Sequence, residues 1–208
     1  MLIKAKHHFM IYPFFKIYSA WIIRSHFGRI EVDNNYKPTN LPVLLLANHF
    51  SWWDGFFVLY WNIRNIKRKF HFMMLEEQLK KFFLFNGAGG FSIRKNSRSI
   101  LDTLNYTSEL LRDNQNMVLI FPQGKIESAF TSQIHFEAGI GRIIERVGNP
   151  VQILFMANLI DYFSNRKPGL YIYVSEYLDQ KRDTASIQEA YNLFLSQCII
   201  ANSLKSDL

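Results

Sequence analysis

Apolar runs alternate along the chain with segments whose apolar residues recur at helical spacing. The apolar runs predict strands at 42–47, 69–74, 90–94, 117–121, 151–156 and 170–174. Helical spacing and helix-end signals predict helices at 55–63, 76–85, 97–112, 136–147 and 184–204. This alternation predicts an α/β fold, a single layered domain in which helices flank a largely parallel central sheet.

The first 30 residues predict a different kind of segment, with five basic residues, no acidic residue and seven aromatic residues. Pro13 and Lys16 interrupt its apolar run, whereas a membrane span needs roughly 20 apolar residues. Tyr18, two residues before Ala20, is too bulky for a secretory cleavage site. We expect one or two amphipathic helices, kinked near Pro13, that lie in a membrane interface. The alternative is a helix packed on the protein's own core.

Composition narrows the class of protein. The 208 residues are 49% hydrophobic and 20% charged, which disfavours disorder, and a single cysteine excludes an internal disulfide and a cysteine-based zinc site. The formal charge of +7 and the 16% aromatic content indicate an anionic partner. Composition leaves three candidates for that partner, namely nucleic acid, an acidic lipid surface or a phosphorylated substrate.

The segment NHFSWWDG follows the first predicted strand and carries the clearest chemistry, because His49 and Asp54 are separated by four residues. A carboxylate on one ring nitrogen would fix the tautomer and leave the other nitrogen able to accept a proton. Such a pair suits a reaction whose nucleophile is a substrate hydroxyl. Ser51, close to the helix start, is interpreted as a cap rather than as a nucleophile.

Two further segments place polar side chains after strands, where sites gather in parallel sheets. GAGGFSIRKNSRS supplies Arg94, Lys95 and Arg98, and FPQGK supplies Gln123, Gly124 and Lys125. Arginine side chains near a helix start suit a phosphate, and a Pro-Gly turn presents polar groups. Each segment alone is typical of a solvated loop.

Together, in this order, the three segments resemble the conserved blocks of the glycerophospholipid acyltransferase family, which includes 1-acylglycerol-3-phosphate acyltransferase. The positions that match are Asn48, His49, Ser51 and Asp54, then Gly90, Phe91 and Arg94, then Phe121, Pro122 and Gly124. Gln123 stands where the family usually has Glu, and Ile126 where it usually has Arg. The second departure concerns an arginine associated with the acceptor's phosphate, so the acceptor is left open.

The resemblance implies a membrane-associated acyltransferase at the cytoplasmic face, with residues 31–208 as its acyltransferase domain. It would use His49 as general base, oriented by Asp54, and acyl-coenzyme A or acyl carrier protein as donor. The acceptor would be the hydroxyl of a lysophospholipid such as 1-acylglycerol-3-phosphate. Six further positions would bind substrate, namely Arg94, Lys95, Arg98, Gln123, Gly124 and Lys125, with the backbone around Gly124 at the oxyanion. We expect no cofactor, no metal and no nucleic acid. The alternatives are transfer to another acceptor (a glycolipid, aminolipid or pigment) and a non-enzymatic basic membrane-binding protein.

Overall fold

A computed structural model of the chain describes residues 2–94 and 99–205. Its strands are β1 Arg29–Asn35, β2 Val43–Ala47, β3 Lys69–Leu75, β4 Gly90–Ile93, β5 Asn116–Ile120, β6 Gln152–Asp161 and β7 Gly169–Glu176. Its helices are α1 Ile11–His26, α2 Asp54–Arg64, α3 Glu76–Lys81, α4 Leu84–Gly87, α5 Ile100–Leu110, α6 Ile140–Val147 and α7 Thr184–Ser203.

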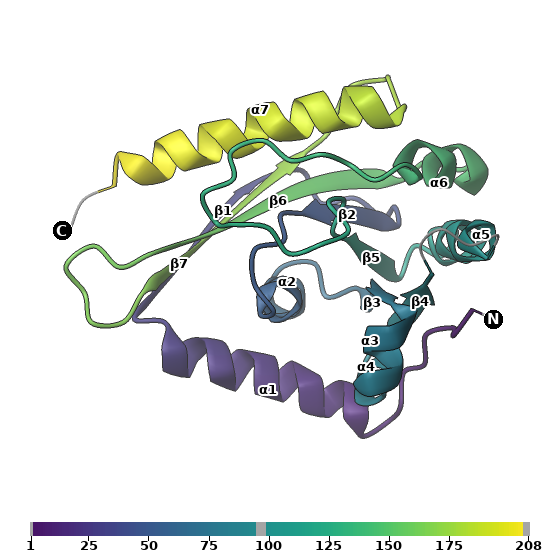
Figure 1. Ribbon diagram of the computed structural model, residues 1–208, viewed down its shortest axis with the longest axis horizontal. Helices are drawn as coiled ribbons and strands as arrows, with labels where there is room; N and C mark the ends of the chain where they lie inside the picture. Colours follow the sequence, from purple (N-terminus) through teal and green to yellow (C-terminus); the bar gives the residue numbers. More distant parts are fainter. Residues whose placement is uncertain (1, 95–98, 206–208) are drawn as a thin grey trace.

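The strands form one seven-stranded sheet in the order β1-β7-β6-β2-β5-β3-β4 (Figure 1). The five strands from β6 to β4 are mutually parallel, with Leu45 of β2 in register with Leu119 of β5 and Leu154 of β6. β7 runs antiparallel to β6, and β1 runs parallel to β7. The prediction of a single α/β domain with a largely parallel sheet is therefore confirmed.

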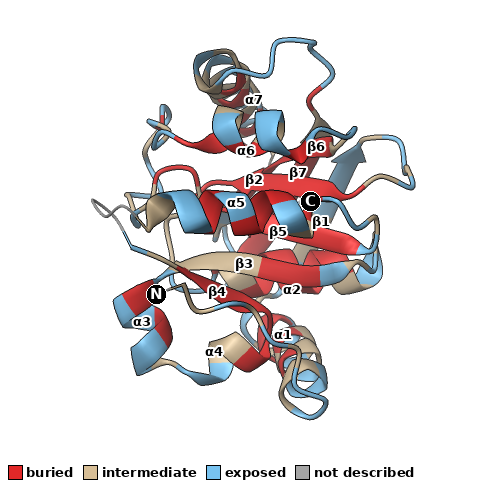
Figure 2. Cartoon of the chain, turned by 90° about the vertical axis from the view of Figure 1, so that its right-hand side faces the viewer, coloured by how far each residue is buried: buried red, intermediate tan, exposed pale blue. Residues whose placement is uncertain are grey.

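Alternating side chains of the central strands face two separate apolar layers. In β2, Leu44 and Leu46 pack in the cluster that includes residues of α5, α6 and α7. Val43 and Leu45 of the same strand pack in the cluster that includes residues of α1 and α2. Figure 2 shows the buried strands between these two helical layers. Burial on both faces explains why the central strands read as continuous apolar runs.

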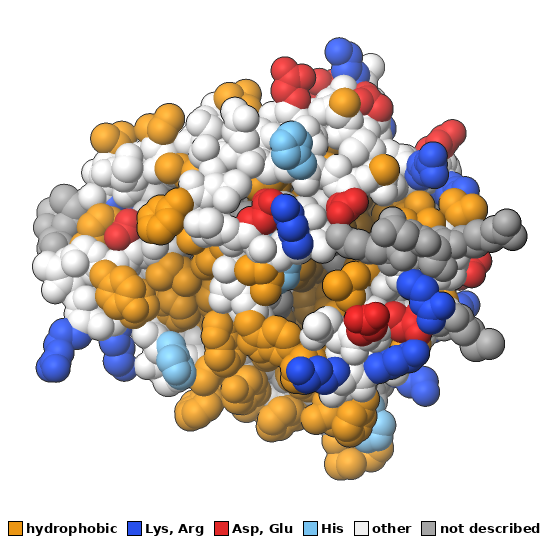
Figure 3. Space-filling model, viewed as in Figure 1, with side chains coloured by type: hydrophobic (Ala, Val, Ile, Leu, Met, Phe, Trp, Pro, Cys, Tyr) orange, Lys and Arg blue, Asp and Glu red, His pale blue; other side chains and the backbone are white. Residues whose placement is uncertain are grey.

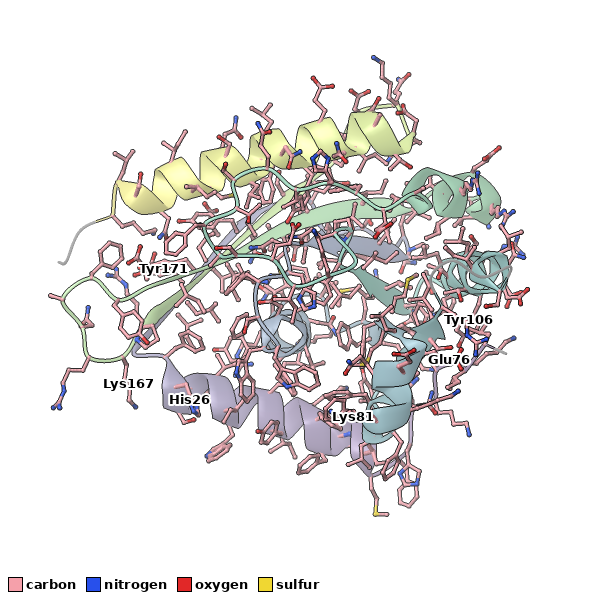
Figure 4. The ribbon with its side chains drawn as sticks, in the orientation of Figure 1. His26, Glu76, Lys81, Tyr106, Lys167 and Tyr171 are labelled. Carbon is pink, nitrogen blue, oxygen red and sulfur yellow. The ribbon has the colours of Figure 1, made fainter. Side chains whose placement is uncertain are left out.

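α1 is a single helix with two different faces. Pro13 lies in its first turn, where the missing N–H removes no helical hydrogen bond, instead of at a kink between two helices as expected. Phe15, Ile22 and Ile23 are buried against the domain core. At the other end, Nζ of Lys167 donates to the carbonyl of Ser25 at 2.8 Å, and Figure 4 labels Lys167 and His26 there. No helix within the described residues is both long and apolar enough to cross a membrane.

Three local features differ from the sequence prediction. β1 was not predicted, because it is an exposed edge strand with a mostly polar sequence. The helix predicted at 136–147 begins only at Ile140, since Gly139 has a φ of +141° that a helix cannot accommodate. The single helix predicted at 76–85 is broken into α3 and α4.

Candidate active site

His49 and Asp54 meet at the carboxyl end of β2, where the strand passes into α2. Nδ1 of His49 lies 2.8 Å from Oδ2 of Asp54. The same carboxylate oxygen accepts hydrogen bonds from the backbone N–H groups of Phe50 and Ser51, both at 2.8 Å. Oγ of Ser51 accepts from the N–H of Trp53 at 3.1 Å, so this serine stabilises the turn. The sequence pair is therefore a contact in the fold.

The environments of the two side chains differ. The Asp54 side chain is fully buried, whereas 20% of the His49 side chain is exposed. Burial raises the pKa of the Asp54 carboxyl, and the hydrogen bonds from His49, Ser51 and Phe50 oppose that rise. Oδ1 of Asp54 is buried without a hydrogen-bond partner among the described residues. All three hydrogen bonds to Asp54 thus converge on the oxygen that faces His49.

Neighbouring contacts fix the position of His49. Its ring stacks on Phe121, with ring centroids 4.0 Å apart and an angle of 10° between the planes. The preceding residue, Asn48, is anchored to β6, because its amide donates to the carbonyl of Asn158 and accepts from the N–H of Asn158 at 2.9 and 2.8 Å. With Nδ1 bonded to Asp54, Nε2 is the ring nitrogen available to a substrate.

The turn after β5 brings Gln123 to His49. Oε1 of Gln123 accepts from the backbone N–H of His49 at 2.7 Å. Gly124 has a φ of +63°, which favours glycine, and its N–H donates to the carbonyl of Phe121 at 3.0 Å. That N–H is therefore used within the turn, and the expected role of the backbone around Gly124 at the oxyanion stays a prediction that concerns other N–H groups of this turn. Nζ of Lys125 lies 3.0 Å from Oε1 of Glu127.

Arg94 lies at the end of β4 and is held by Glu76. Nε and Nη2 of Arg94 donate to the two carboxylate oxygens of Glu76 at 3.0 and 2.8 Å. The hydrogen bonds from Arg94 and then from Lys80 hold the pKa of Glu76 at about 2. Figure 4 labels Glu76 at one end of α3 and Lys81 at the other. The other two predicted basic residues of this segment, Lys95 and Arg98, lie outside the described residues.

An apolar cavity of about 470 Å³ opens beside the His–Asp pair. His49, Gly124 and Lys125 line it, and so does Trp52, two residues before α2. The rest of its wall is largely apolar. It includes the side chains of Phe70, Phe72, Met73, Met74, Phe85, Ile93, Ile100, Leu104, Ile140 and Ile143. Figure 3 shows hydrophobic side chains around the hollow on this face.

Sequence reasoning missed two residues of this region, Glu76 and Glu127. Glu76 directly follows β3 and Arg94 directly follows β4, and the last pair in register between those strands is Leu75 with Ile93. Glu127 donates its backbone N–H to the carbonyl of His49 at 2.9 Å. The position of Glu76 after a predicted strand was a usable signal that it lies at the edge of the sheet where sites gather, whereas its pairing with Arg94 depends on the strand order.

Among the described residues, no group of three His, Cys, Asp or Glu side chains is arranged to hold a metal ion. The arrangement instead presents one imidazole nitrogen, backed by a buried carboxylate, to an apolar cavity. It can accept a proton from a hydroxyl group bound next to an acyl chain.

Comparisons with known proteins agree with this geometry. The model of a family described as Acyltransferase matches residues 29–157, which is more than half of the chain. A solved structure, the 1-acyl-sn-glycerophosphate (LPA) acyltransferase PlsC from Thermotoga maritima, is similar in fold with a TM-score of 0.58. The similarity covers 94% of this chain and 80% of that one at 16% sequence identity. A search of curated proteins finds no match.

Proposed function

The chain belongs to the Acyltransferase family and is an enzyme that transfers acyl groups, and we propose that its acceptor is the hydroxyl of a lysophospholipid such as 1-acylglycerol-3-phosphate. The donor is an acyl thioester, either acyl-coenzyme A or acyl carrier protein. The observation that carries the proposal is the 2.8 Å contact between His49 and Asp54 at the wall of the apolar cavity.

In the proposed mechanism, Nε2 of His49 takes the proton of the acceptor hydroxyl while Asp54 holds the ring through Nδ1. The hydroxyl oxygen bonds to the carbonyl carbon of the thioester, and the carbon–sulfur bond then breaks. The departing thiolate takes the proton from His49, which returns the imidazole to its neutral form. General base catalysis of this kind contributes roughly 100- to 10,000-fold to the rate.

The shape and lining of the cavity support an acyl chain as one ligand. Its volume of about 470 Å³ lies within the range of roughly 300 to 1,000 Å³ for small-molecule sites. Aliphatic and aromatic side chains dominate the lining, so a fatty acyl chain gains free energy by leaving water. His49 and Lys125 are polar residues of the lining, and in the proposal the reactive end of such a chain lies beside the imidazole.

Thiol release from acyl-coenzyme A, measured with the purified protein and a panel of lysolipids, tests the proposed acceptor. We expect release with lysophosphatidate and the diacyl product in the lipid extract. The panel also contains lyso-acceptors without a phosphate monoester, and acyl carrier protein replaces coenzyme A in parallel reactions. Absence of transfer to any lysophospholipid from either donor would overturn the proposal.

A second candidate is the same transfer to an acceptor without a phosphate monoester, such as a glycolipid or aminolipid. Two observations favour it. The guanidinium group of Arg94 is already paired with the Glu76 carboxylate through Nε and Nη2. Lys125 is the one Lys or Arg side chain among the described residues of the cavity lining, and it is paired with Glu127. Product formation only with acceptors that lack phosphate would select this candidate.

We also propose that the outer face of α1 binds a membrane surface. Phe14, Ile17 and Trp21 recur at helical spacing along that face and are 57%, 71% and 62% exposed. Phe83, just before α4, is 71% exposed, and the basic side chains of Arg24 and Lys81 are also exposed. Exposed aromatic residues beside basic residues suit the headgroup region of an anionic bilayer.

Co-sedimentation with vesicles tests the membrane proposal. Truncating α1 would disturb the core that Phe15 and Ile23 fill, so Ile17→Asp and Trp21→Asp are better variants. Both are expected to lower binding to vesicles that contain phosphatidylglycerol. Leu193→Asp is the matched control, because Leu193 is 62% exposed on α7, which covers the other side of the sheet (Figure 1). Equal binding by all three variants and the wild type would count against the proposal.

A further inference from the structure

A closed ring of three hydrogen bonds holds the backbone of His49. The N–H of His49 donates to Oε1 of Gln123 at 2.7 Å, and Nε2 of Gln123 donates to Oε2 of Glu127 at 2.8 Å. The N–H of Glu127 donates back to the carbonyl of His49 at 2.9 Å. The N–H and the carbonyl of His49 are therefore bonded to Gln123 and Glu127 respectively, and both of these residues follow β5 in the chain.

The ring depends on an amide at position 123. An amide side chain can accept from the N–H of His49 with its oxygen and donate to Glu127 with its nitrogen. A carboxylate at position 123, which the family usually has there, would face the Glu127 carboxylate at hydrogen-bond distance. Gln123 is only 4% exposed, so water would screen that repulsion poorly. The Glu127 carboxylate therefore favours an amide over a carboxylate at position 123.

Glu127 has a second contact that does not explain this arrangement. Its Oε1 pairs with Nζ of Lys125, whose side chain is 69% exposed, and an ion pair this exposed contributes little to stability. The other carboxylate oxygen, Oε2, accepts from the nearly buried amide of Gln123. Hydrogen bonds from Gln123 and Lys125 lower the pKa of Glu127, which keeps it an acceptor.

We propose that Glu127 is a positioning residue for the general base: it orients the Gln123 amide so that the amide oxygen faces the N–H of His49, and the ring fixes His49 relative to the cavity. The inference rests on the proposed role of His49. It replaces the expected substrate-binding role of Gln123 with a role in holding the base.

An exchange of the two side chains tests the proposal. Gln123→Glu places two carboxylates together, and we expect kcat at pH 8 to fall by about 10- to 100-fold with KM changed by less than about threefold. The loss should shrink at lower pH, where the pair can share a proton. Gln123→Glu combined with Glu127→Gln restores one acceptor and one donor, so kcat and the pH profile should return to within about threefold of wild type. Gln115→Glu, at an exposed position, is the matched control.

Two results would overturn the proposal: a Gln123→Glu variant with the kcat and pH profile of wild type, or a double variant no more active than the single one. If the single variant does not fold, Glu127→Ala replaces it, and unchanged kcat in that variant overturns the proposal. An inactive wild type would instead refute the proposed function. Thermal unfolding at pH 8 then tests the hydrogen-bonded ring separately. The midpoint should fall in Gln123→Glu and recover in the double variant. Equal midpoints in the wild type and both variants would contradict a stabilising role of the ring.

Discussion

The rings of His49 and Phe121 lie face to face, with centroids 4.0 Å apart and planes 10° apart. Asp54 bonds the edge of the same imidazole through Nδ1, so the ring is held both by its face and by its edge. These two contacts do not involve Nε2, and His49 lines the apolar cavity. A general base needs this kind of placement, because proton transfer requires hydrogen-bond distance to the hydroxyl.

Replacing His49 with alanine should abolish acyl transfer without unfolding the protein. The side chain supplies the proposed base, and it lines the cavity and belongs to neither apolar layer of the core. Thiol release should fall by roughly 100-fold or more, while circular dichroism and the unfolding midpoint stay near wild-type values. A folded His49→Ala protein that retains near-normal transfer would refute the proposed mechanism.

Asp54→Asn should also lose most of the activity. An amide at position 54 no longer selects the tautomer with the proton on Nδ1, and it removes the negative charge that stabilises the protonated imidazole. We expect kcat to fall by about 100- to 10,000-fold. Single-turnover measurements check that the loss lies in the chemical step, and normal kcat would show that Asp54 has a purely structural role.

Stability should fall as the pH drops from about 6.5 to about 4. His71 is buried. This burial, and to a smaller extent the nearby His7, lowers the pKa of His71 from an ordinary 6.5 to about 4. In this window the unfolded chain binds a proton that folded His71 does not bind, so acid favours unfolding. The difference corresponds to roughly 3 kcal/mol of unfolding free energy, full stability being present above pH 6.5.

Urea unfolding at a series of pH values checks this expectation. His71→Gln should flatten the dependence between pH 6.5 and 4, although His7, whose pKa burial also lowers, retains part of it. His135→Gln is the control, because His135 is exposed. An equal slope in wild type and His71→Gln would contradict the assignment.

Two glycine-to-alanine substitutions should have opposite effects on stability. At Gly89, φ is +104° and an added Cβ would lie 2.1 Å from the carbonyl oxygen of Phe70. Gly89→Ala should therefore destabilise the fold by roughly 3 kcal/mol or more. Gly55 lies in α2 with nothing within 4 Å of an added Cβ, so Gly55→Ala should stabilise by roughly 0.5 to 1 kcal/mol. Equilibrium unfolding of both variants measures the two effects.

The strands that carry the site were predictable because both of their faces are buried. β2 and β5 consist entirely of buried residues, so their sequences contain continuous apolar runs without the alternation of a half-exposed strand. Knowing where these strands end was enough to expect His49 and Gln123 at the edge of a parallel sheet where sites gather. The match of the Acyltransferase model confirms the family inferred from the motif order.

Contacts that depend on strand order or on one backbone angle were not predictable. Arg94 meets Glu76 only because β4 lies next to β3, and the sequence does not state which strands are neighbours. Glu127 returns to His49 after a turn whose Gly124 has a positive φ. β1 gave a weak signal, since only Ile30 and Val32 alternate among polar residues.

The outer edges of the sheet are protected in two ways. At β4, the N-terminal residues 3–7 occupy the edge, where the carbonyl of Ile3 accepts from the N–H of Ser92 at 3.0 Å and His7 pairs with Ala88. At β1, charged side chains lie along the edge, where Glu31 forms ion pairs with Arg29 and Lys205. Both devices oppose the addition of a strand from another molecule. A chain trimmed to begin after residue 8 is therefore expected to self-associate through β4, which light scattering would detect as growth in particle mass.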